Sequence, residues 1–123
     1  MNTMTAFQRE VDEWMDACFG EPIKSDKLER ADRFIEEALE LAQTCPSFTA
    51  DRAHALVDYV FNRDQGEINQ EVGGVMVTLA ALCNVAGVDI LAAAEIELAR
   101  VWTKVEQIRA KQAAKPTGSA LPS

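Results

Sequence analysis

The chain has 123 residues, of which 48% are hydrophobic and 26% charged, and its net charge is −8 at neutral pH. This length suits one domain with a single core and leaves little room for two. The acidic balance argues against a general nucleic-acid binder, because binding to a phosphate backbone needs a basic surface. An ordinary soluble protein, or one that concentrates cations, fits the composition better.

The cysteines and the histidine do not form a recognisable metal motif. Cys18, Cys45 and Cys83 are widely spaced, and the single histidine, His54, cannot complete a zinc site with them. Each cysteine lies in an apolar helical pattern, so we expect buried, reduced thiols in a reducing compartment. The N-terminus does not resemble a signal peptide, and no stretch reaches the roughly 18 apolar residues of a membrane span. We therefore expect a cytoplasmic protein.

Helical periodicity runs through the chain without an alternating strand pattern, which predicts an all-α fold. A capping box formed by Thr5 and Gln8 starts the first helix, which stops at Gly20. Ser25 is the expected cap of a second helix, and Thr49 that of a shorter third one.

The fourth predicted helix, over residues 67–86, is the most apolar, and it follows a turn cluster at residues 62–66. Gly87 is its expected stop, and Asp89 caps a fifth helix that runs to about Ala113. A helix this apolar must be covered on most sides, which a small monomer achieves poorly. We therefore expect a bundle of four to five helices that is completed by formation of a homodimer or homotetramer. The domain is expected over residues 1–113, with a disordered tail over residues 114–123.

Three glutamates lie close together on the second predicted helix. Glu36 and Glu37 are four and three residues before Glu40, so their side chains point from neighbouring turns. The simpler interpretation is a solvated acidic face with Arg33 as its ion-pair partner. Like charges at this spacing oppose helix formation by about 0.2–0.5 kcal/mol per pair.

A second pair of glutamates, Glu67 and Glu71, stands at the head of the apolar fourth helix. A carboxylate that enters such a helix is costly to desolvate unless it is paired or bound to a metal ion. Two helices that present carboxylates toward one gap would form an all-oxygen site suited to Mg²⁺ or Mn²⁺. Such ions hold triphosphate oxygens and activate water.

Two adjacent glycines, Gly73 and Gly74, interrupt the same helix. Each costs about 1 kcal/mol relative to alanine in a helix interior. One explanation is close packing of helices, including packing across a dimer. The other is that the missing side chains leave room for a metal-bound phosphate or water.

These residues resemble the signature of the MazG-like, all-α nucleoside triphosphate pyrophosphohydrolases. That signature is a basic residue and Glu-Glu-x-x-Glu on one helix, followed by Glu-x-x-Asp on another. The first half is present in full, in Arg33, Glu36, Glu37 and Glu40. The second half matches at Glu71, but Gly74 stands where the aspartate is expected. The resemblance covers roughly residues 7–111.

The resemblance implies cleavage of a nucleoside triphosphate between its α- and β-phosphates, giving the monophosphate and pyrophosphate. It implies Glu37, Glu40 and Glu71 as metal ligands, with Glu36 either a further ligand or the base that orients water. Glu36 and Glu37 are thus the expected catalytic residues. Glu67 either compensates for the missing aspartate as a ligand, or water fills that place.

The resemblance also implies phosphate contacts from basic residues, for which the alternative is ordinary surface ion pairs. The candidates are Arg33, Lys104 and Arg109. Trp14 and Asn84 are candidates for a base pocket, although Trp14 also fits the helix core. The chain looks similar to compact phage-type members, some of which remove dGTP, so we expect dGTP or GTP in a bacterial or phage-infected cytosol. The alternatives are a dUTP- or dCTP-directed house-cleaning enzyme and a non-catalytic helical regulatory protein.

Overall fold

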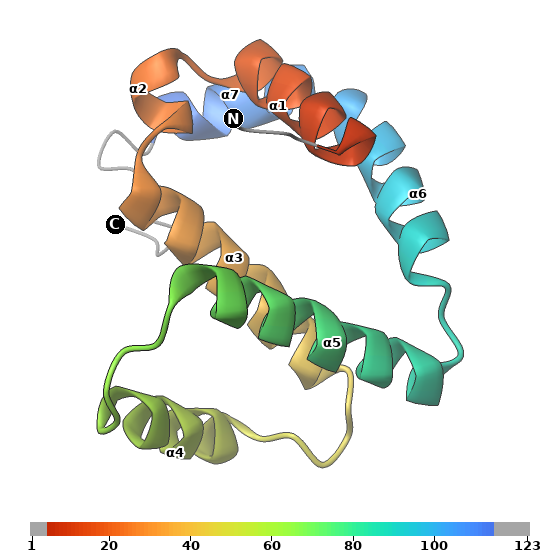
Figure 1. Cartoon of the computed structure of the whole chain (residues 1–123). Helices are drawn as coiled ribbons and strands as arrows, with labels where there is room; N and C mark the ends of the chain where they lie inside the picture. The colour runs from red at the N-terminus through yellow and green to blue at the C-terminus, as the bar shows by residue number, and fades with distance from the viewer. Residues whose placement is uncertain (1–4, 115–123) are drawn as a thin grey trace. The chain divides into compact units, whose positions relative to one another are not determined.

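The computed structural model describes residues 5–114, and this part of the chain consists of helices joined by turns and short loops (Figure 1). The predicted all-α class is confirmed. The described residues form seven helices rather than four or five: α1 (Ala6–Cys18), α2 (Glu21–Lys24), α3 (Lys27–Gln43), α4 (Ala50–Phe61), α5 (Ile68–Ala86), α6 (Ile90–Trp102) and α7 (Val105–Ala113). Of the tail expected over residues 114–123, residues 115–123 lie outside the described residues.

Local capping residues start several helices as the sequence predicts. The backbone N–H of Gln8 donates to Oγ1 of Thr5 at 3.1 Å, and the Thr5 N–H donates to Oε1 of Gln8 at 3.2 Å, so the capping box of α1 is complete. Thr49 accepts from the backbone of α4 in the same way. At the end of α5, Gly87 adopts a left-handed conformation with φ of 70°, which glycine allows without steric cost.

The start of α3 differs from the prediction. Oδ1 of Asp26, not Ser25, accepts the helix N–H of Glu29, at 3.2 Å. The Ser25 hydroxyl instead donates to the carboxylate of Glu21 in the short helix α2. Pro22 lies in the first turn of α2, where the N–H that proline lacks would have had no partner inside the helix. Pro22 therefore lies at the start of a new turn of helix.

The predicted fifth helix is broken into α6 and α7. The N–H and the hydroxyl of Thr103 both donate to the carbonyl oxygen of Arg100, at 3.0 and 2.6 Å, and the Lys104 N–H donates to that of Val101 at 3.0 Å. These three-residue steps tighten the chain and end the α-helix. As a result α7 packs against α1 (Figure 1), where Nε of Arg109 donates to the Ala17 carbonyl oxygen at 2.8 Å.

The chain divides into two compact units, which we call the terminal unit (Met1–Glu37 with Ala94–Ser123) and the central unit (Ala38–Ala93). Helices α3 and α6 each run from one unit into the other. The buried apolar side chains among the described residues all belong to the terminal unit: Met15, Cys18 and Leu98. In the same unit, Trp14 meets the ring of Phe19 edge-on, with centroids 6.3 Å apart.

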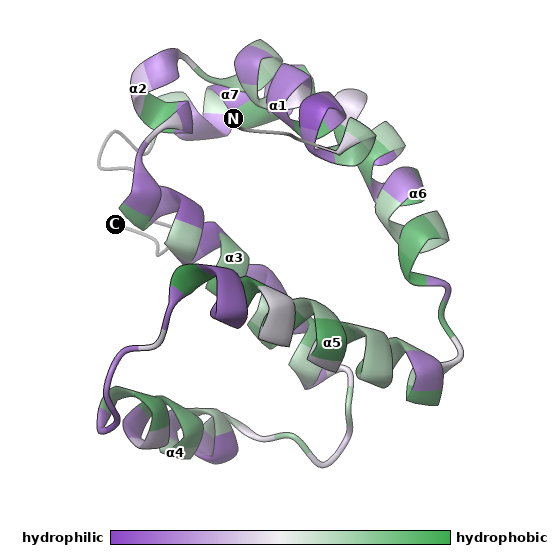
Figure 2. Cartoon of the chain, in the orientation of Figure 1, coloured by the Kyte–Doolittle hydropathy of each residue, from purple (hydrophilic) through white to green (hydrophobic). Residues whose placement is uncertain are grey.

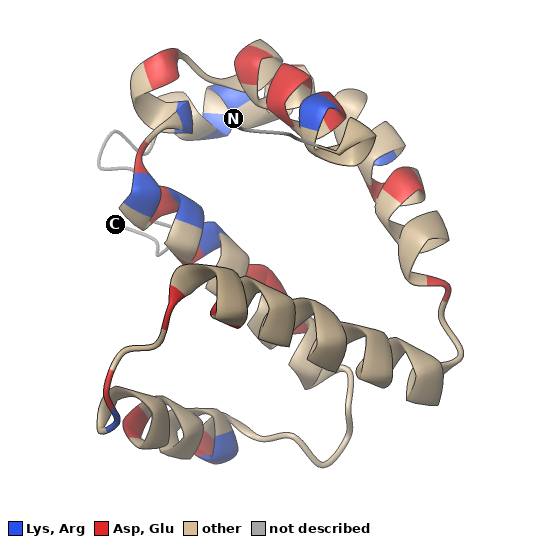
Figure 3. Cartoon of the chain, viewed as in Figure 1, with Lys and Arg blue, Asp and Glu red and all other residues tan. Residues whose placement is uncertain are grey.

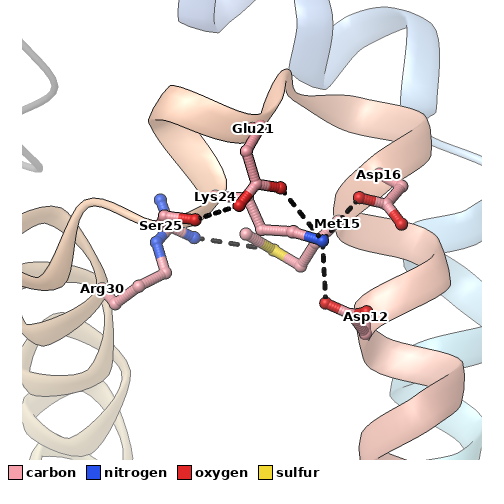
Figure 4. Close-up of polar contacts among 7 residues, drawn as sticks. All are labelled: Asp12, Met15, Asp16, Glu21, Lys24, Ser25 and Arg30. Carbon is pink, nitrogen blue, oxygen red and sulfur yellow. Dashed lines mark hydrogen bonds and ion pairs between the residues drawn. The ribbon is translucent and has the colours of Figure 1, made fainter.

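An ion-pair cluster joins α2 to α1 within the terminal unit (Figure 4). Nζ of Lys24 lies 2.7 Å from Oδ1 of Asp16 and 3.2 Å from Oδ1 of Asp12. Hydrogen bonds to these two carboxylates raise the pKa of Lys24 above its ordinary value. The pKa of Glu21 on α2 is lowered, chiefly by the hydrogen bond from the Ser25 hydroxyl and next by the positive charge of Lys24.

The central unit has no buried residue among those described. Helix α5 is apolar along most of its length (Figure 2), yet Val72, Val77 and Val85 are 59, 70 and 88% exposed. On α4, Phe61 is 83% exposed. Helices are stabilised chiefly by the packing of an apolar face, so these helices lack the cover that would stabilise them.

Within the part of the chain that the structure describes, no single helix is long and apolar enough to cross a membrane. Helices α5 and α6 reach that length and composition only when taken together as a bent pair.

The cysteines differ in exposure, although all three are free thiols. Cys18 is buried as predicted, Cys83 is half-buried, and Cys45 is exposed, so the prediction of buried thiols was wrong for Cys45. Cys45 lies past the end of α3, in an exposed bend of the chain. Burial raises the pKa of the Cys18 thiol, and nearby Arg109 offsets part of this rise.

Candidate carboxylate site

The acidic segment of α3 consists of Glu36, Glu37 and Glu40, all of which are exposed. Figure 3 shows basic and acidic residues together in the first half of α3, whereas the charged residues of its second half are all acidic. One continuous helix carries the three glutamates, so Glu40 lies one turn beyond Glu36 and Glu37, as the spacing predicts. Glu36 and Glu37 belong to the terminal unit and Glu40 to the central unit.

Arg33 connects this segment to a residue that sequence reasoning missed. Its Nη1 lies 3.6 Å from Oε1 of Glu36, and its Nη2 lies 3.7 Å from Oε1 of Glu29. Arg33 is thus the ion-pair partner of the acidic face, as the simpler interpretation of the sequence has it. Glu29 is 2% exposed and is the one buried charged residue between residues 5 and 114. Its position four residues before Arg33 was the available signal.

Glu71 is the single charged residue of α5, and it lies in the first turn of that helix. Its carboxylate is folded back against Gly66, in the loop before α5. A Cβ atom at position 66 would overlap Oε2 of Glu71 and lie 3.0 Å from its Cδ. The absence of a side chain at Gly66 therefore leaves room for the Glu71 carboxylate.

Glu67 has a structural role at the start of α5. Its carboxylate accepts the backbone N–H of Asn69 at 2.6 Å and that of Gln70 at 3.3 Å. A carboxylate at a helix N-terminus satisfies free N–H groups and is favoured by the helix dipole. Capping accounts for Glu67 without a metal ion.

The glycine pair of α5 faces open space. A Cβ atom built on Gly73 or Gly74 would meet no described atom within 4 Å, apart from its chain neighbours and the backbone of its own helix. Within the central unit, no other helix therefore accounts for the two glycines. Close helix packing, including packing across a dimer, and a bound ligand remain the two explanations.

The predicted phosphate and base contacts lie in different surroundings. Arg109 lines a cavity of about 480 Å³ in the terminal unit, between the end of α1, α2 and α7, and Lys104 is exposed in the turn before α7. The Trp14 indole is half-buried, and its N–H donates to the Val101 carbonyl oxygen. Asn84 is exposed on α5, in the central unit.

The donor set suits a hard divalent cation, because carboxylate oxygens are the ligands that Mg²⁺ and Mn²⁺ prefer. Among residues 5–114, however, no three Asp, Glu, His or Cys side chains form a group that could hold a metal ion. The candidate ligands Glu40 and Glu71 lie in the central unit. Glu37 belongs to the terminal unit, as the last residue of its first segment, Met1–Glu37. Neither unit by itself holds the full set.

Comparison of the chain with protein-family models, with curated proteins and with solved structures returned no match. The described residues define an all-α chain. Helix α3 carries an acidic segment, and helix α5 is apolar and largely exposed.

Proposed function

We propose that the chain is a metal-dependent nucleoside triphosphate pyrophosphohydrolase of the MazG-like type, which cleaves between the α- and β-phosphates. The observation that carries the proposal is the acidic segment of α3 combined with a lone carboxylate, Glu71, at the head of an apolar helix. The first half of the family signature and Glu71, the matching residue of its second half, thereby lie on separate helices, α3 and α5. The all-helical fold is a further support.

In this proposal Glu37, Glu40 and Glu71 hold Mg²⁺ or Mn²⁺, and Glu36 orients the attacking water. The bound ions would neutralise charge on the triphosphate and lower the pKa of water. This chain's own contribution is the placement of carboxylates on two helices, α3 and α5. Glu67 is the least favoured ligand, because its carboxylate already accepts two backbone N–H groups.

Lys104 and Arg109 remain the proposed contacts to phosphate. A purine nucleotide, dGTP or GTP, is the proposed substrate, on the resemblance to compact phage-type enzymes. Trp14 is a weaker candidate for the base pocket than Asn84, because its indole N–H is already used within the fold.

The proposed assembly is a homodimer or homotetramer in which α5 packs against a second copy of the chain. The central unit lacks buried residues, and most of the exposed large apolar side chains belong to it. From Val72 to Ala86, α5 has no charged residue, so two copies would meet there without repulsion between like charges. The open space beside Gly73 and Gly74 would let the backbones approach closely.

Incubation of the purified chain with each deoxynucleoside and ribonucleoside triphosphate, with Mg²⁺ or Mn²⁺, tests the proposal. Release of a monophosphate and pyrophosphate, fastest with dGTP or GTP, is expected. Fastest release from dUTP or dCTP would favour the house-cleaning alternative. Release from no nucleotide would favour a helical regulatory protein, for which Gly74 in place of aspartate is the main argument.

A further inference from the structure

Glu29 is a buried charged group to which the proposed reaction gives no role. Its side chain is 2% exposed, whereas that of Glu36, two turns later on α3, is 47% exposed. A carboxylate removed from water is destabilising unless charges and hydrogen bonds compensate for the lost solvation. The surroundings of Glu29 should therefore show what compensates for the burial of its charge.

Two arginines surround Glu29, but they satisfy it incompletely. Its Oε1 lies 3.2 Å from Nη2 of Arg30 and 3.7 Å from Nη2 of Arg33. Nevertheless Oε1 of Glu29, and Nε and Nη2 of Arg30, are buried without a hydrogen-bond partner among the described residues. Glu29 thus holds two guanidinium groups mainly through charge. A partly satisfied buried network is a poor source of stability, which indicates another use.

Arg30 is fixed by the apolar side of the terminal unit. Its guanidinium lies over the ring of Phe19, with Cζ 5.5 Å from the centroid, and its Nη1 contacts Sδ of Met15 at 3.5 Å (Figure 4). Met15 is part of the buried core. Arg30 therefore fixes the position of Glu29 from one side.

Arg33 extends the network from Glu29 to the acidic segment. One arm of its guanidinium faces Glu29, and the other lies 3.6 Å from Oε1 of Glu36. The guanidinium is planar and presents its donors as a rigid fork. When Glu29 holds one arm, the range of positions in which the other can meet Glu36 is limited.

We propose that Glu29 and Arg33 are positioning residues of the pyrophosphohydrolase site: Glu29 anchors Arg33, and Arg33 fixes the carboxylate of Glu36. This inference rests on the proposed function. It also changes the role of Arg33, because both of its arms face carboxylates instead of a phosphate. Residues that orient a metal ligand or a catalytic side chain, without touching the substrate, typically contribute about 10–100-fold to activity.

The test compares Glu29→Gln, Arg33→Gln and the double variant with the control Glu21→Gln. The control breaks an ion pair on α2, in which Oε2 of the exposed Glu21 lies 3.5 Å from Nζ of Lys24. Each protein is assayed for kcat and KM on the nucleotide that the unmodified chain cleaves best. Calorimetry measures binding of a non-hydrolysable triphosphate analogue, and circular dichroism follows thermal unfolding.

Each single variant is expected to lower kcat about 10–100-fold, with little change in KM or in affinity for the analogue. The double variant should be no slower than the slower single one, because both substitutions break one chain of contacts. Glu21→Gln should behave as the unmodified chain. Arg33→Lys should recover only part of the rate, because an ammonium group cannot hold both carboxylates in the fork geometry.

A raised KM and weaker analogue binding in Arg33→Gln, at unchanged kcat, would assign Arg33 to phosphate binding and overturn the positioning role. Multiplying losses in the double variant would also overturn it. If Glu29→Gln does not fold, the half-exposed Arg33 variants decide the question alone. An unmodified chain that cleaves no nucleotide overturns the proposed function together with this inference. Full activity in both single variants overturns the inference only.

Discussion

The indole Nε1 of Trp14 donates a hydrogen bond of 3.1 Å to the carbonyl oxygen of Val101, which joins α1 to α6 within the terminal unit. The two residues are 87 positions apart in the sequence. The Val101 carbonyl also accepts the N–H of Lys104 at the break before α7. Trp14 therefore contacts the chain at the point where the predicted fifth helix ends.

Replacement of Trp14 by phenylalanine should lower the free energy of unfolding by about 1 kcal/mol, since one hydrogen bond is lost while most of the ring contact remains. Denaturant unfolding measures the effect, with Trp102→Phe as the control. If Trp14 serves the fold alone, KM for the nucleotide should not change. A large rise in KM at unchanged stability would favour the base-pocket role.

Glu37→Gln or Glu40→Gln should abolish nucleotide turnover and leave the helical content intact. Removal of one charge from neighbouring carboxylates relieves a repulsion of about 0.2–0.5 kcal/mol, so the fold should not suffer. Pyrophosphate release and circular dichroism are the two measurements. Rates equal to those of the unmodified chain in both variants would make the proposed metal site untenable.

Val77→Asp on α5 should convert the proposed oligomer to a monomer and lower its thermal stability. Val77 is 70% exposed in the single chain, and a carboxylate buried in an apolar interface without a partner is costly. Light scattering after size-exclusion chromatography gives the mass. Leu28→Asp is the matched control, because Leu28 is 74% exposed but lies in the terminal unit. A monomeric unmodified chain would contradict the proposed assembly.

Gly66→Ala should reduce turnover with little loss of stability. The added methyl group displaces the carboxylate of Glu71, which is the flexible end of a side chain and can move. Rates are compared with those of Glu71→Gln, which should show at least as large a loss. Normal activity of the Gly66→Ala variant would indicate that the position of the Glu71 carboxylate has no role in the reaction.

Gly73→Ala distinguishes the two explanations of the glycine pair. Among the described residues, nothing beyond the helix's own backbone lies within 4 Å of the added Cβ, so helix propensity alone would stabilise α5 by about 1 kcal/mol. If α5 of a second subunit packs closely there, the same change should weaken the oligomer instead. Unfolding and molecular mass are measured as the protein is diluted. These measurements show whether Gly73→Ala strengthens or weakens the protein and its oligomer.

Raising the pH should weaken the fold through Cys18. Burial raises the pKa of this thiol above its ordinary value of 9.0, so the neutral form is favoured in the folded state. The contribution is fully present below pH 9.0 and is lost as the pH rises through the pKa of the folded state. Unfolding of the unmodified chain and of Cys18→Ala is compared between about pH 8 and pH 10.5, a range set by the ordinary cysteine value. The stability difference should shrink as the pH rises.

The sequence by itself determined the all-α class and several helix ends, because helix caps and stops depend on neighbouring residues. The capping box at Thr5 and the left-handed Gly87 were predicted for this reason. The spacing of Glu36, Glu37 and Glu40 likewise fixed which of their side chains are neighbours on α3.

Only the tertiary structure decided which groups are buried and what they contact. The break at Thr103 and Lys104 allows α7 to pack on α1, a contact between the two ends of the chain that local signals do not encode. Burial of Glu29 depends in the same way on neighbours that only the fold supplies, although its helical spacing to Arg33 was visible in the sequence. Burial and long-range pairing are properties of the packed chain, because they depend on residues far apart in the sequence.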